Sequence, residues 1–131
     1  MDFEHALFYL EKLDRRIKFE NFTASDEVKY EIWQFYAYIS VYMRDLPKAL
    51  EMSESILQLA EKKKSRRMRF YAYYIRSVIY MYQSKLQESI ESAGIAKNIA
   101  IEGNMERAQF EAELVEIQAK MAGWNNIFFW F

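Results

Sequence analysis

The chain has 131 residues, of which 52 % are apolar and 18 % aromatic, so it suits one domain with a buried core and excludes a disordered segment. Its 18 basic and 19 acidic side chains nearly cancel, which argues against a protein that mainly holds nucleic-acid backbone. It has no cysteine, which excludes disulfides and thiolate chemistry. No secretory leader pattern opens it and no apolar run approaches a membrane span, so we expect a soluble, cytoplasmic protein.

The predicted elements are all helical. Three glycines and one proline stand among long stretches rich in Glu, Lys, Ala, Leu and Met, which favours an all-α chain. The apolar pattern predicts about seven helical segments, at residues 2–20, 26–44, 47–63, 66–83, 87–101 and 104–122 and, as an opening turn, at 125–131.

Capping residues agree with these boundaries. Ser25 can cap the helix that begins at Asp26. Pro47 falls in a first turn, where its missing N–H has no intrahelical partner in any case. Gly103 and Gly123 lie where we expect helices to end in a left-handed turn.

An internal repeat organises the chain. The hexamers DFEHAL, DLPKAL, KLQESI and GWNNIF each have an apolar residue second. These residues, Phe3, Leu46, Leu86 and Trp124, are 43, 40 and 38 positions apart. A period near 40 in helix pairs indicates a solenoid in which neighbouring pairs stack. We therefore expect one repeat domain over residues 1–131.

Helix pairs of this period resemble tetratricopeptide repeats, over nearly the whole chain. The two positions where that repeat needs small side chains, because its helices A and B cross closely, fall on Ala37 and Ser77 and on Ala6, Ala49 and Ser89. Arg76 stands where the repeat usually has Leu. The resemblance implies a right-handed superhelix of antiparallel helix pairs, a TPR-like α-solenoid, with the A helices lining a concave groove.

The resemblance also implies the residues of that groove. Tyr and Met there could hold an apolar peptide, because phenols offer a large contact area and Met repacks easily. The peptide-binding candidates are Gln34, Tyr38, Tyr42, Tyr71, Tyr74, Met81 and Tyr82. In the third A helix the groove positions fall on Gln109, Ala112, Glu116, Ala119 and Lys120. Alternatively the rings are core packing, which we favour for Trp33, Tyr36, Tyr73 and Tyr80.

The tyrosine-rich A helices EIWQFYAYISVYM and RFYAYYIRSVIYMYQ give a second resemblance. The chain looks like the repeats of cytoplasmic peptide-pheromone receptors of Gram-positive bacteria and their phages, the Rap, Rgg and arbitrium group. That resemblance implies the sensor part of a peptide-responsive regulator. The output domain that such receptors carry, often a helix-turn-helix, is not visible in the sequence.

The phase of the repeat predicts that the helices at the two ends of the chain lack some of their repeat neighbours. The chain begins with a helix B without its helix A and stops within another helix B, so apolar side chains there lack repeat neighbours. The self-association candidates are Phe3, Leu7, Leu10, Phe128, Phe129, Trp130 and Phe131. We expect a homo-oligomer or a piece of a longer repeat protein; alternatively the tail folds back on the last helix.

The run KKKSRRMR is the strongest charge feature. It could bind anions, including nucleic acid, or it could be a solvated helix end whose cations favour the helix dipole. Its members are Lys62, Lys63, Lys64, Arg66, Arg67 and Arg69.

Catalytic features are not found in the sequence. We interpret the sole histidine, His5, as a solvated residue, and one His without Cys cannot build a zinc site. Glu111, Glu113 and Glu116 are interpreted as a solvated cluster. We therefore expect no enzyme and no cofactor. Three hypotheses remain open: a module that binds a peptide or protein, a structural segment that self-associates, and a nucleic-acid accessory.

Overall fold

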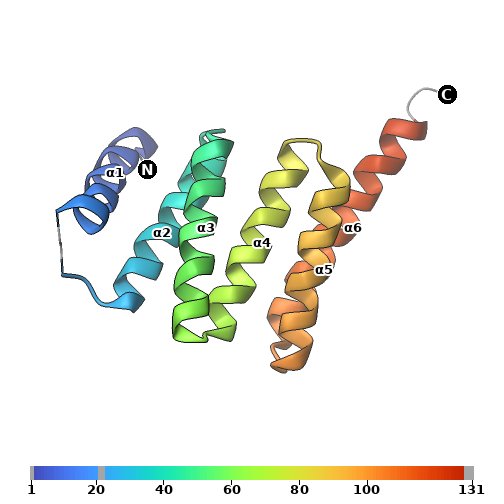
Figure 1. Cartoon of the computed structure of the whole chain (residues 1–131). Coiled ribbons are helices and arrows are strands. Elements are labelled where there is room, and N and C mark those ends of the chain that lie inside the picture. The colour runs from blue at the N-terminus through green and yellow to red at the C-terminus, as the bar shows by residue number, and fades with distance from the viewer. Residues whose placement is uncertain (1, 21–22, 129–131) are drawn as a thin grey trace.

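The computed structural model describes the backbone of residues 2–20 and 23–128 and the side chains up to residue 123. The described residues form helices and no strands, so the all-α prediction is confirmed. Their bounds are α1 Phe3–Phe19, α2 Asp26–Tyr42, α3 Leu46–Lys63, α4 Arg66–Tyr82, α5 Leu86–Glu102 and α6 Glu106–Phe128. From α2 onward, consecutive helices pack side by side in alternating directions (Figure 1). This packing is that of a helical repeat.

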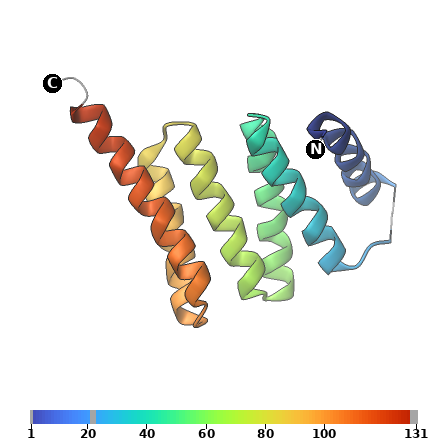
Figure 2. The same ribbon diagram turned by 180° about the vertical axis from the view of Figure 1, so that it is seen from behind.

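The helices from α2 onward form two layers. Seen from behind, α2, α4 and α6 lie in front, with α3 and α5 behind them (Figure 2). α1 lies at one end of the array and packs against α2, and α6 lies at the opposite end. We call the layer of α2, α4 and α6 the A layer.

Identical turns explain why the helices stack so regularly. From α2 onward the helices begin at residues 26, 46, 66, 86 and 106, so each helix with its turn takes 20 residues. Arg44, Lys64, Ser84 and Asn104 each take a left-handed backbone, with φ between 52° and 65°. The next N–H donates to a carbonyl five residues back, as Asp45 does to Ser40 at 2.8 Å. This Schellman geometry ends α2, α3, α4 and α5 in the same way, and two such units give the 40-residue period.

The expectation about Gly103 is correct for the helix end but not for the left-handed residue, and the expectation about Gly123 is wrong. α5 ends before Gly103, as predicted, and a left-handed residue follows. The left-handed residue after α5 is Asn104, whereas Gly103 has φ of −95°. Gly123 does not end a helix, because α6 continues through it to Phe128, and a separate helix therefore does not open at residue 125. A lone glycine costs a helix only about 1 kcal/mol relative to alanine, so it does not break a helix without a turn to follow.

Helix starts follow the predicted capping. The side chains of Ser25, Asp45 and Ser65 each accept a hydrogen bond of 3.2 Å from the N–H three residues later. Pro47 lies in the first turn of α3, as predicted. Lys85, at the same place before α5, makes no side-chain cap. The chain thus keeps the turn geometry even where the capping side chain is missing.

Small side chains let the two layers approach closely. Ala37 and Ser77 of the A layer are fully buried, as are Ala49 and Ser89 of the other layer. The Ser89 hydroxyl donates a 2.7 Å hydrogen bond to the backbone carbonyl of Ser77, so α5 lies directly against α4 at this crossing. The close crossing expected at Ser77 and Ser89 is confirmed, and Ala37 and Ala49 are buried as that expectation requires, whereas Ala6 is only partly buried.

The core changes character along the array. Around α2, α3 and α4 it contains large side chains, among them Tyr30, Trp33, Met52 and Ile56. Between α5 and α6 it is built mainly of alanines, and those with at most 2 % exposure are Ala93, Ala96, Ala100, Ala112 and Ala119. Because alanine side chains are short, they allow α5 and α6 to pack closely against each other.

Arg76 has a structural role that explains its departure from the repeat pattern. Its Nε donates to the Ser53 hydroxyl at 3.3 Å, and its guanidinium pairs with Glu54. Both partners belong to α3, so Arg76 joins α4 to the preceding helix where leucine would only fill space.

Candidate functional site

An aromatic cluster lies on the A layer. The rings of Tyr71 and Tyr74 lie 5.0 Å and 5.7 Å from the ring of Phe70, and the Phe70 and Tyr74 rings are nearly parallel. Phe70 is fully buried, whereas the two tyrosines are half-buried. These separations are those of favourable aromatic pairs, so Phe70 holds the two phenols in place at the surface.

Tyr38 of α2 adds a third phenol to this cluster. Its phenol is hydrogen-bonded to Gln34, one turn earlier. It also lies close enough to Tyr71 and Tyr74 that a negative charge on either phenol would raise the pKa of Tyr38. Burial raises the pKa of Tyr38 to about 12, although 40 % of the residue remains exposed. Burial also raises the pKa of Tyr74. At neutral pH these phenols are therefore uncharged and offer hydroxyl groups that donate and accept hydrogen bonds. We call Gln34, Tyr38, Tyr71 and Tyr74 the tyrosine face.

Glu111 of α6 borders the tyrosine face. With Tyr71 and Met105 it lines an open pocket of about 430 Å³, and its carboxylate lies 3.4 Å from Nε of Arg107. Its charge also contributes to the raised pKa of Tyr74. Sequence reasoning missed this role and placed Glu111 in a solvated cluster. The 40-residue spacing from Tyr71 was the signal that could have found it.

The expected groove residues of α6 are wrong by two positions. Ala112 and Ala119 are buried, with 0 % and 1 % exposure, so they cannot line a groove. The error came from aligning Trp124 with Leu86, although the helix starts are 40 residues apart and no turn precedes Trp124. Counted from those starts, the α6 residues equivalent to the tyrosine-face positions include Glu111 and Leu114.

A second pocket lies at the other end of the tyrosine face. It has a volume of about 490 Å³ and is lined by Tyr38, Val41, Tyr42, Arg44 and Tyr82. The Arg44 guanidinium lies 4.3 Å from the centre of the Tyr82 ring, a cation–π contact. Tyr38 thus belongs both to the phenol cluster and to this pocket. Arg44 was not a sequence candidate, although it lies within the predicted segment 26–44.

The remaining groove candidates differ in exposure. Tyr42 and Tyr82 are 67 % and 48 % exposed, and the Tyr42 ring lies 4.3 Å from that of Phe3. Gln34 and Met81 are half-buried. Of the rings assigned to the core, Trp33 and Tyr36 are buried as predicted, whereas Tyr73 and Tyr80 are only partly buried.

The basic run is largely occupied by contacts with α2. Lys62 and Lys63 lie 3.8 Å and 3.4 Å from Asp26, and Arg67 pairs with Glu27. These contacts support the structural interpretation of the run for three of its six members. Across the described part of the chain, Lys64, Arg66 and Arg69 have no ion-pair partner.

The self-association candidates at the start of the chain point inward. Leu10 is buried, and Phe3 and Leu7 are partly buried against the core. The exposed apolar side chains of α1 are instead Phe8, Tyr9 and Phe19. The candidates at the other end lie outside the described side chains, namely Phe128, Phe129, Trp130 and Phe131.

The sole histidine and the acidic side chains form no metal site in the described part of the chain. His5 is exposed, and its Nδ1 lies 2.6 Å from a carboxylate oxygen of Asp2. Over residues 2–20 and 23–128, no group of three or more His, Cys, Asp or Glu side chains is placed to hold a metal ion. No helix in that part of the chain is both long and apolar enough to cross a bilayer. Comparison with known proteins finds no matching family model, no matching curated protein and no matching solved structure.

Proposed function

We propose that the chain is a noncatalytic, cytoplasmic interaction module that binds a peptide or protein segment along the tyrosine face. The observation that carries this proposal is the convergence of partly exposed phenols from α2 and α4 between two open pockets. In the proposed arrangement the layers curve as a right-handed superhelix, with α2, α4 and α6 on the concave side.

The chemistry of the face suits a short extended peptide. Tyr38, Tyr71 and Tyr74 offer flat apolar surface for side chains, and their hydroxyl groups can bond peptide amides. Glu111 at one pocket and Arg44 at the other bring opposite charges to the two ends of the face. A peptide that spans both pockets would therefore bind in a preferred direction. The chain would then act as the sensor part of a peptide-responsive regulator.

Peptide display provides the test. A random peptide library is selected on the wild-type chain alone, and the dissociation constants of the enriched peptides for the wild type and for the double variant Tyr38→Ala/Tyr74→Ala are measured by calorimetry. We expect the double variant to weaken binding at least tenfold, because contact area and hydroxyl partners are both lost. Circular dichroism and urea unfolding establish that the variant is folded.

The matched control is Tyr9→Ala, which removes an exposed phenol from α1, away from the tyrosine face. Its affinity should equal that of the wild type. Equal binding by the wild type and the double variant would refute the proposal, as would a selection that enriches no peptide.

A further inference from the structure

α6 has two different apolar faces. The inner face packs against the array and is built of small, buried side chains, Ala108, Ala112, Val115 and Ala119. The outer face carries large side chains with exposures of 59 %, 55 %, 52 % and 49 %, in the order Phe110, Leu114, Ile117 and Met121. We call these four residues the α6 stripe. The core of α6 is therefore complete without them.

The equivalent positions in the other A-layer helices show that this exposure is unusual. Phe110 corresponds to Tyr30 and Phe70, which are fully buried. Ile117 corresponds to Ala37 and Ser77, which are also fully buried. In α2 and α4 a following helix covers these positions, whereas no described residue covers them on α6. A contiguous row of large exposed apolar side chains marks an interaction surface.

The spacing of the stripe is that of a helix-pairing seam. Its members are separated by four, three and four residues, the alternation of a coiled coil. In the sequence, Trp124 and Phe128 continue the alternation, and α6 has 23 residues where the other helices have 17 or 18.

The size of Ile117 argues against one more repeat helix as the occupant. The close crossing in this array needs Ala or Ser at that position, as at Ala37 and Ser77. A branched isoleucine would hold a helix B away from α6. Two parallel or antiparallel helices in a coiled coil are spaced more widely and accept such side chains as knobs.

We propose that the α6 stripe binds the same stripe of a second copy of this chain, as a two-fold antiparallel pair of α6 helices. Two-fold pairs are the commonest form of self-association, and they use one patch on both copies. In the register we propose, Leu114 of each copy lies opposite Ile117 of the other, and Phe110 lies opposite Met121.

Charges that flank the stripe favour this direction. In the antiparallel register Glu113 of each copy lies beside Lys120 of the other, which gives two opposite-charge pairs. In a parallel pair Glu106 of one copy would lie against Glu111 of the other, and like charges there are unfavourable. The tyrosines of α2 and α4 are not part of this seam, so this proposal and the peptide-binding proposal can fail separately.

Sedimentation equilibrium tests the pairing. The full chain should sediment as a dimer, and Leu114→Glu/Ile117→Glu should sediment as a folded monomer, since both side chains are already exposed in a single copy. The matched control is Ile95→Glu/Ile101→Glu, which changes two comparably exposed residues of α5 and should leave the dimer intact. A monomeric wild type would overturn the proposal, as would a dimer that survives the stripe substitutions.

Disulfide trapping tests the direction, because the chain has no cysteine of its own. A mixture of Phe110→Cys and Met121→Cys chains should give a disulfide between the two kinds of chain, and neither kind alone should cross-link. Cross-linking of each variant with itself would indicate a parallel pair and overturn the proposed register. In addition, Glu113→Lys should weaken the dimer and Glu113→Lys/Lys120→Glu should restore it.

Discussion

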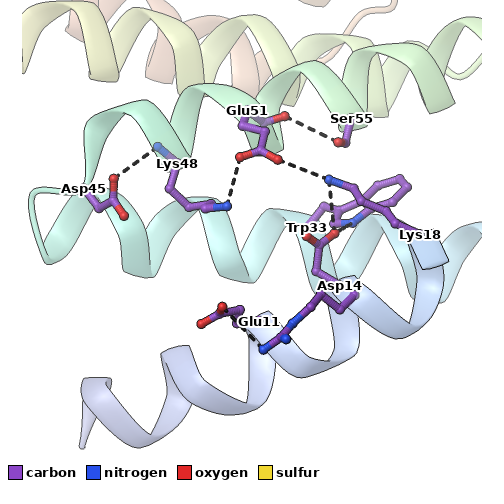
Figure 3. A network of polar contacts seen from close by, with 9 residues as sticks. Glu11, Asp14, Lys18, Trp33, Asp45, Lys48, Glu51 and Ser55 are labelled. Carbon is purple, nitrogen blue, oxygen red and sulfur yellow. Dashed lines mark hydrogen bonds and ion pairs between the residues drawn. The ribbon is translucent and has the colours of Figure 1, made fainter. Parts of the chain in front are cut away.

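The indole Nε1 of Trp33 donates a 2.9 Å hydrogen bond to a carboxylate oxygen of Asp14, which joins α2 to α1. Both residues are buried, with 8 % and 6 % exposure. Lys18 lies 3.4 Å from the same Asp14 oxygen and 3.4 Å from Glu51 of α3, and Lys48 holds Glu51 at 2.9 Å (Figure 3). This network ties α1 to both α2 and α3 at the end of the array.

Replacing the buried carboxylate should loosen α1. Asp14→Ala leaves the Trp33 N–H without its partner, and a buried unpaired donor costs about 1–3 kcal/mol in the free energy of unfolding. Urea unfolding measures the loss, and hydrogen exchange should show faster exchange in α1 than in α4. The control is Glu11→Ala, which removes an exposed carboxylate from the same helix. Equal losses from both substitutions would contradict a special role for Asp14.

The missing cap before α5 should be repairable. Lys85 has φ of −89° and ψ of 71°, nearly the backbone of the capping residue Asp45, yet it makes no side-chain cap. Lys85→Asp should therefore raise the free energy of unfolding by about 1 kcal/mol, because an aspartate there can accept from a free N–H of the first turn. Thermal and urea unfolding measure the gain. Removing the cap that α3 already has, by Asp45→Ala, should lower the free energy of unfolding by a similar amount. An unchanged free energy of unfolding in either variant would refute the argument.

The left-handed turn residues offer a second gain in stability. Ser84 has φ of 60°, a conformation that costs residues with a Cβ about 1–2 kcal/mol and costs glycine little. Ser84→Gly should raise the free energy of unfolding by about 0.5–1 kcal/mol, since the added freedom of the unfolded glycine offsets part of the gain. Thermal unfolding measures the change. Ser92→Gly, within α5, is the control and should be destabilising.

Alkaline pH should destabilise the chain through the tyrosine face. The pKa of Tyr38 is raised from 10 to about 12 by burial, so between these pH values the unfolded chain releases a proton that the folded chain keeps. The free energy of unfolding therefore falls as pH rises through this window. Urea unfolding at several pH values measures the slope, and Tyr38→Phe should reduce it. Equal slopes for the wild type and Tyr38→Phe would contradict the assignment.

Much of the fold could be predicted from local chemistry. Ser25 and Pro47 indicated helix starts because capping and first-turn preferences are properties of a few neighbouring residues. The resemblance to a known helical repeat assigned small side chains to Ala37 and Ser77, where a neighbouring helix was expected to approach closely. The boundaries of α2 to α5 accordingly fall close to the predicted ones.

The candidate site was harder to predict because it depends on register between distant segments. One apolar residue, Trp124, set the expected phase of α6, and a shift of two residues turns a helix by more than half a revolution. That shift put Gln109 in the place of the bordering Glu111, and the buried Ala112 in the place of Leu114. Leu10 was likewise predicted to lie on an exposed self-association surface, because it is apolar and near the start of the chain. It is buried instead, on the side of α1 where Asp14 pairs with Trp33 of α2.

The 20-residue unit of one helix and one turn has a consequence for how this chain can vary. A change in length by one whole helix pair would leave every remaining junction in its present geometry, because each junction depends only on its own few residues. A single residue inserted within α4 would instead rotate every later side chain of that helix by about 100°. Lineages of such a protein should therefore differ by whole helix pairs far more often than by single residues within a helix.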